Sequence, residues 1–137
     1  MLRSKLFSAG SIALLLCILS ADILARQPQG VRVKVGNSSV EKRSRIKVEF
    51  LEMMDDSRCP IDTTCIWAGN AHIKIRVSKN GKSKTMELNS TVKNSDNTFA
   101  GYEFKLAALT PVPRSNIRID RNGYVATISM NKFGKSN

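Results

Sequence analysis

Residues 71–88 read Ala-His-Ile-Lys-Ile-Arg-Val-Ser-Lys-Asn-Gly-Lys-Ser-Lys-Thr-Met-Glu-Leu. Apolar and polar side chains alternate on both sides of Asn80-Gly81, which is typical of two strands that each turn one face toward a core. Asn-Gly favours a two-residue hairpin turn because both central residues of that turn need a positive φ. Counting outward from the turn predicts the cross-strand pairs Ile75–Met86 and Ile73–Leu88 toward the core, and Lys74–Glu87 and Arg76–Thr85 toward water.

The same period of two recurs in segments 31–35, 46–50 and 102–106, and no segment after residue 25 has a convincing helical period. Residues 106–109, Leu-Ala-Ala-Leu, are expected to form at most a turn. A second Asn-Gly pair predicts a second hairpin, in which Ile119 faces Ala126, Ile117 faces Ile128 and Arg118 faces Thr127. We therefore predict an all-β fold, an antiparallel β-sandwich of about seven strands. An immunoglobulin-like arrangement fits this pattern, and closure into a barrel is the alternative.

The first 25 residues have the three parts of a secretory signal peptide. Residues 1–5 are basic, residues 12–19 are apolar, and Ile-Leu-Ala at 23–25 is an acceptable cleavage site. The apolar run is too short to span a bilayer comfortably, which takes about 20 residues, and an uncleaved anchor is the alternative. We predict a signal peptide over residues 1–25 and one domain over residues 26–137. That domain is expected to be exported, periplasmic or secreted, and not membrane-spanning.

Export to an oxidising compartment determines whether the cysteines are expected to form a disulfide. Cleavage leaves Cys59 and Cys65, and an even number of cysteines in an oxidising compartment predicts a disulfide. The bridge would close the short ring 59–65 and add about 2 kcal/mol of stability in the chain-entropy model.

The ring lies within a distinctive segment. Residues 55–70 read Asp-Asp-Ser-Arg-Cys-Pro-Ile-Asp-Thr-Thr-Cys-Ile-Trp-Ala-Gly-Asn. This segment resembles a family of small exported bacterial proteins, many of them lipoproteins, that carry Asp-Ser-Arg-Cys-Pro, a short loop and Cys-x-Trp-Ala-Gly. The family has no established activity, so the resemblance implies a fold and export rather than a function. This chain departs from it by lacking a lipobox.

The residue types in this motif predict a rigid scaffold loop. Asp56 and Arg58 are expected to pair across the turn, and Gly69 suits a tight or positive-φ position. Pro60 stands inside the ring, and Trp67 is expected to pack on or near the bridge and to organise the core. The alternative is a binding loop that the scaffold displays.

The sequence offers little for catalysis. His72 is the single histidine, it lies on the outward face of its strand, and no nucleophile-elbow sequence accompanies it. A zinc site would have to use both cysteines, and the acidic residues lack the spacing of a calcium loop. We therefore predict a protein that is not an enzyme and that uses no metal and no cofactor.

The net positive charge of the chain indicates polyanionic binding partners. The chain has 22 Lys and Arg against 11 Asp and Glu, a net charge of +11, and removal of residues 1–25 would leave +10. If the strands share a sheet, their outward side chains form a basic face, with lipopolysaccharide or anionic lipid as polyanionic partners. Few aromatic residues accompany the charge, so specific nucleic-acid binding is not expected. A merely solvated face is the alternative reading. The residues of the predicted basic face are Arg45, Lys47, Lys74, Arg76 and Lys82.

Together these features predict an exported, non-enzymatic β-sandwich module that binds a protein or polyanionic component of the cell envelope. The alternative is a secreted inhibitor of a hydrolase that inserts the disulfide ring 59–65 into a target cleft. The sequence does not specify an oligomeric state.

Overall fold

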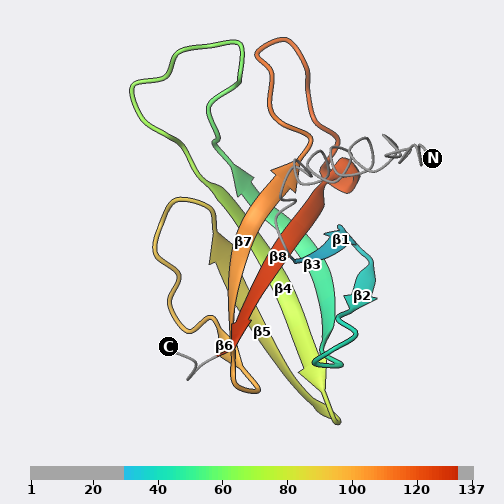
Figure 1. The fold of residues 1–137 in the computed structure, drawn as a ribbon. Coiled ribbons are helices and arrows are strands. Elements are labelled where there is room, and N and C mark those ends of the chain that lie inside the picture. The colour runs from blue at the N-terminus through green and yellow to red at the C-terminus, as the bar shows by residue number, and fades with distance from the viewer. Residues whose placement is uncertain (1–29, 133–137) are drawn as a thin grey trace, which may run out of the picture.

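A computed structural model describes residues 30–132, which form two antiparallel four-stranded sheets that face each other (Figure 1). The predicted signal peptide lies outside the described residues. One sheet has the order β1-β8-β7-β6 and the other the order β2-β3-β4-β5. The strands are β1 (Val31–Lys34), β2 (Ser38–Val40), β3 (Lys47–Asp56), β4 (Ala71–Lys79), β5 (Lys82–Asn89), β6 (Thr98–Phe99), β7 (Tyr102–Thr110) and β8 (Val125–Lys132).

Strands that pair within a sheet are consecutive in the chain, apart from β1 beside β8, and the chain passes from one sheet to the other between β1 and β2 and between β5 and β6. This meander is a simpler connectivity than the Greek key of immunoglobulin domains. The predicted all-β sandwich is confirmed, with eight strands in place of about seven.

The hairpin β4–β5 has the predicted register at all four pairs, including Ile75 opposite Met86 and Lys74 opposite Glu87. Asn80 and Gly81 have φ values of 51° and 75°, as the turn requires. Because apolar and polar side chains alternate along the strands, one face of each sheet is buried. Among the largest fully buried side chains are Phe50, Ile73, Ile75, Phe104 and Ile128.

The second predicted hairpin is wrong. Arg121–Gly123 is a short 3-10 helix, and β8 pairs with β1 and β7. The carboxylate of Asp120 accepts a hydrogen bond from the Asn122 backbone N–H, so local capping replaces the hairpin turn. Ile117, expected opposite Ile128, is 58% exposed.

The predicted turn at 106–109 is also wrong, because these residues belong to β7. The register shifts between Leu106 and Ala108, so a bulge lies within the strand. The extra residue brings Leu106 and Leu109, three positions apart, to the buried side. A bulge therefore accounts for the break in the period of two.

The strand directions give the sandwich two different ends. We call the end with the loops 57–70 and 111–118 the loop end, and these loops lie at the top of Figure 1. We call the opposite end, with the Asn80-Gly81 turn and loop 41–46, the hairpin end.

Candidate functional site at the loop end

An ion pair anchors the base of loop 57–70. Arg58 donates hydrogen bonds from Nε to Asp56 Oδ1 at 2.7 Å and from Nη2 to Asp56 Oδ2 at 2.8 Å. The two side chains are only 16% and 11% exposed. This bidentate pair confirms the predicted contact within the motif, and its geometry is that of a strong charge-assisted bond.

The pair also ties the loop to the other sheet. Arg58 donates to the backbone carbonyls of Leu109 at 2.6 Å and Pro111 at 3.0 Å, at the end of β7. The Tyr124 hydroxyl donates to Asp56 Oδ2 at 2.9 Å, next to the start of β8. Both sheets therefore meet at these contacts. We call the three side chains together the Asp56–Arg58–Tyr124 network.

Burial and hydrogen bonding act on the titration of this network. Burial alone would raise the pKa of Asp56, but the hydrogen bonds from Arg58 and Tyr124 together outweigh it and lower that pKa. Burial, followed by the hydrogen bond to Asp56, raises the pKa of Tyr124 to about 12. The network is therefore complete when Asp56 is ionised and Tyr124 is protonated.

The pH dependence of stability follows from these directions. The Asp56 contribution is present above about pH 4 and is lost as the pH falls through the folded-state pKa. The Tyr124 contribution is present below about pH 10 and is lost as the pH rises toward 12. We expect chemical denaturation of Tyr124→Phe to show a smaller fall in the free energy of unfolding between pH 10 and 12 than the unaltered protein shows. Equal alkaline falls in the two proteins would contradict this assignment.

A second set of contacts closes the neck of the loop. Ser57 donates its backbone N–H to the Asn70 carbonyl at 2.8 Å, and Asn70 donates its backbone N–H to Ser57 Oγ at 3.1 Å. Gly69 lies between them with φ of +68°, and a Cβ there would overlap the Ser57 carbonyl oxygen. The predicted tight position of Gly69 is confirmed.

Asn70, which the sequence reading did not single out, extends this neck to loop 89–97. Its Oδ1 accepts the backbone N–H groups of Ser90 and Thr91 at 3.1 and 3.2 Å. Its position directly after the Trp-Ala-Gly motif is the local signal that could have marked it.

The disulfide and a neighbouring loop brace the rest of the segment. Cys59 and Cys65 are bonded as predicted, with their Cα atoms 5.9 Å apart. Ile61 donates its N–H to the Pro113 carbonyl at 3.0 Å. Asp62 accepts the N–H and hydroxyl of Ser115 at 3.0 and 2.8 Å. The ring 59–65 is thus held sideways against loop 111–118.

The loop end exposes large apolar side chains on this braced base. Trp67 is 72% exposed and Ile66 is 96% exposed, so the prediction that Trp67 organises the core is wrong. The aromatic ring that is buried at this motif is instead that of Tyr124, which is only 6% exposed and donates its hydroxyl to Asp56. The exposed large apolar residues of loops 57–70 and 111–118 are together called the apolar patch, and they are Ile61, Ile66, Trp67, Val112 and Ile117.

Comparison with known proteins does not add to this geometry. No family model, curated protein or solved structure matches the chain. The site must therefore be interpreted from its own contacts.

The predicted basic face is divided. Lys74 Nζ lies 3.8 Å from Glu52 Oε2, and Arg76 Nη1 lies 3.9 Å from Glu49 Oε2. Carboxylates therefore accompany the cations in the middle of the sheet. The strand register places Glu49 opposite Arg76 and, across a bulge, Glu52 opposite Lys74. Arg45, Lys47 and Lys82 lie instead at the hairpin end.

The single histidine pairs with a carboxylate across the β4–β5 hairpin. His72 lies within 2.8 Å of Glu87 on the outward face of the β4–β5 hairpin. Within residues 30–132, no three His, Cys, Asp or Glu side chains are grouped as metal ligands. In the same range, no helix has the length and apolarity needed to cross a bilayer.

Proposed function

We propose that the protein is an exported, non-enzymatic module that binds a protein of the cell envelope through the apolar patch. The observation that carries the proposal is the exposure of Trp67 and Ile66 on a base fixed by a disulfide and by hydrogen bonds. Export is supported by the predicted signal peptide, by the disulfide and by the resemblance of segment 55–70 to exported bacterial proteins.

A protein partner fits the chemistry of the patch. Clustered exposed apolar side chains mark interaction sites, and tryptophan is enriched among the residues that dominate binding energy. The braced loops lose little conformational entropy on binding, because their backbone is already ordered by Pro113 and Ser115. These two properties favour contact with another folded protein.

The geometry favours this contact over insertion of the ring 59–65 into a hydrolase cleft. Ile61 has already donated its N–H to loop 111–118, and Asp62 is bonded to the same loop. The two most exposed residues of the apolar patch, Ile66 and Trp67, follow the ring rather than form part of it. An inhibitor would instead depend on Ile61, Thr63 and Thr64.

The test is affinity capture from an envelope extract with three immobilised proteins. The first is unaltered, the second carries Ile66→Ser and Trp67→Ser, and the third carries Val40→Ser. Val40 is 56% exposed on β2, outside the loop end, so it is a matched control for loss of exposed apolar surface. We expect one protein to be retained by the unaltered and Val40→Ser proteins at high salt, and to be lost from the Ile66/Trp67 variant.

Retention of the same protein by all three would contradict the proposal. Loss on truncation of Ile61, Thr63 and Thr64, with no loss in the Ile66/Trp67 variant, would replace it with the inhibitor mechanism. The captured protein is identified by mass spectrometry and its binding is repeated with purified components.

A further inference from the structure

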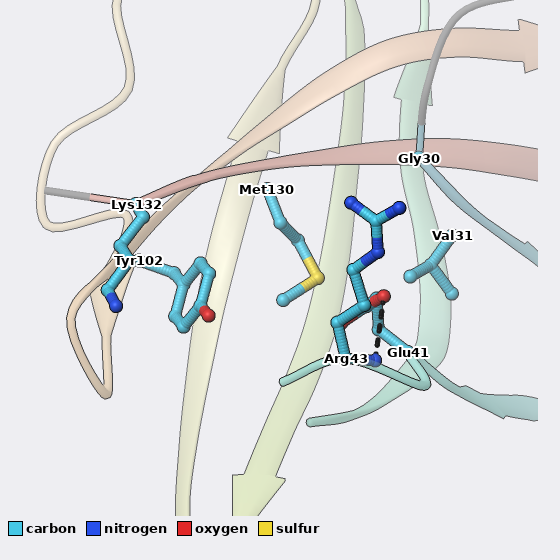
Figure 2. Close-up of a pocket in the computed structure, with 7 residues that line it drawn as sticks. All are labelled: Gly30, Val31, Glu41, Arg43, Tyr102, Met130 and Lys132. Carbon is cyan, nitrogen blue, oxygen red and sulfur yellow. Dashed lines mark hydrogen bonds between the residues drawn. The ribbon is translucent and has the colours of Figure 1, made fainter. Parts of the chain in front are cut away.

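The hairpin end carries a concentration of positive charge. A shallow hollow there is lined by Arg45, Lys47, Lys79 and Lys82 together with Ser78 and Ser83. Arg43 and Lys132 line a second hollow at the same end (Figure 2). We call these six cations the basic end, which comprises Arg43, Arg45, Lys47, Lys79, Lys82 and Lys132.

Carboxylates offset only part of the charge of the basic end, since Glu41 and Glu49 lie beside its six cations. Among the described residues, the one ion pair that involves this group is Lys47 with Glu49, at 3.8 Å. Glu41 also lines the second hollow, where its carboxylate accepts the backbone N–H groups of Ser44 at 2.6 Å and Arg43 at 3.1 Å. Those bonds, the one from Ser44 first, lower the pKa of Glu41, so this carboxylate stays ionised and offsets one positive charge of the basic end.

Two features of the basic end are unfavourable for the free protein. Lys79 and Lys82 are directly opposite each other across the hairpin, and like charges in that arrangement destabilise a sheet. Arg45 has a φ of 56°, a left-handed conformation that is strained for a residue with a side chain. A bound anion would offset the repulsion between the lysines.

Apolar surface lies next to these cations. Lys79 and Lys82 also line a hollow with Phe99 and Ala100. In the hollow of Figure 2, Tyr102 and Met130 lie between the side chains of Lys132 and Arg43. Cations beside apolar floors suit a phosphate-bearing amphiphile better than a nucleic acid, which has phosphates but no acyl chains.

We infer that the hairpin end docks onto the phosphate-bearing surface of an anionic lipid membrane. The loop end, at the opposite end of the strands (Figure 1), then points away from the membrane. This inference uses none of the residues of the apolar patch, so it stands or falls separately from the proposed protein binding.

The test is sedimentation with vesicles of equal parts phosphatidylglycerol and phosphatidylcholine, with pure phosphatidylcholine vesicles as the baseline. The protein is purified from an oxidising compartment, and the variant Lys79→Gln/Lys82→Gln is compared with Lys74→Gln/Arg76→Gln. Both pairs remove two charges from the same hairpin, but the second pair lies among Glu49 and Glu52. Each cation near an anionic surface contributes about fivefold, so we expect about 25-fold weaker binding for the first variant and less than about threefold for the control.

Trp67 reports the orientation of the bound protein, because it is the single tryptophan and lies at the loop end. We expect its fluorescence to remain accessible to an aqueous quencher on the vesicles. Protection of Trp67 by vesicles, or equal loss of binding in both variants, would overturn the inference. If Lys79→Gln/Lys82→Gln fails to fold by circular dichroism, Arg43→Gln/Lys132→Gln replaces it with the same expected loss.

Two further probes identify the source of the anion. Duplex DNA at equal phosphate concentration is expected to bind more weakly than the anionic vesicles, and equal or stronger binding would overturn the lipid assignment. Inorganic phosphate at millimolar concentration is expected to leave vesicle binding in place. Full displacement by inorganic phosphate at constant ionic strength would show a site for the free ion, and it would also overturn the inference.

Discussion

Replacing Arg58 with alanine is expected to lower the free energy of unfolding by about 3 kcal/mol. The change leaves the Asp56 carboxylate largely buried without its cation, with Tyr124 as its remaining side-chain donor. It also removes the donors to the carbonyls of Leu109 and Pro111. Urea denaturation at neutral pH measures the effect, and an unchanged m-value would show that the loss comes from stability alone.

Lys105→Ala is the matched control. Lys105 pairs with Glu103 at 3.1 Å, but the two side chains are 53% and 32% exposed. Pairs in water contribute less than about 1 kcal/mol, so this variant should be nearly as stable as the unaltered protein. Similar losses in Arg58→Ala and Lys105→Ala would show that the Asp56–Arg58–Tyr124 network has no special role.

Gly69→Ala is expected to lower the free energy of unfolding by about 3 kcal/mol, through backbone strain and overpacking together. The positive φ of +68° is unfavourable for alanine, and the new Cβ would overlap the Ser57 carbonyl oxygen. The same denaturation experiment measures the change. Because the neck of loop 57–70 must open to relieve the overlap, the apolar patch should also lose binding to the proposed envelope partner.

Gly36→Ala separates the two causes. Gly36 has a similar φ of +79°, but no atom lies within 4 Å of the position of its Cβ. We expect a loss of about 1 kcal/mol there, from the backbone conformation alone. A loss at Gly69 no greater than that at Gly36 would contradict the close packing of the neck.

The sequence allowed the β4–β5 hairpin to be predicted pair by pair because its determinants are local. Asn80-Gly81 specifies the turn, and the alternation beside it specifies which face is buried. The prediction of a hairpin at the second Asn-Gly pair is wrong because Asp120, two residues before it, caps a short 3-10 helix. The partners of β8 come from β1 and β7, and no local pattern identifies them.

The contacts of the candidate site are likewise of two kinds: local contacts, which the sequence predicts, and long-range contacts, which it does not. The contact between Asp56 and Arg58 and the tight Gly69 follow from neighbouring residues and were predicted. The carbonyl of Leu109 and the hydroxyl of Tyr124 are more than fifty positions away from Arg58 and Asp56, and the sequence gives no sign of them. The prediction of a packed Trp67 is wrong because it rests on residue type alone, and residue type does not separate a buried tryptophan from an exposed one.

The basic face shows how a small irregularity changes a surface. The predicted basic face assumes that each strand keeps a strict period of two. The register of β3 shifts after Phe50, which brings Glu52 opposite Lys74. The middle of the sheet is therefore mixed in charge, and the excess of positive charge lies at the hairpin end.

The central claim is that the motif of residues 55–70 holds Trp67 in water instead of using it for packing. Acrylamide quenching of the intrinsic fluorescence tests this directly, because the chain contains one tryptophan. We predict quenching of the folded protein close to that of the same protein in denaturant, as expected for a side chain that is 72% exposed. A folded protein whose tryptophan is strongly shielded from acrylamide would contradict the account.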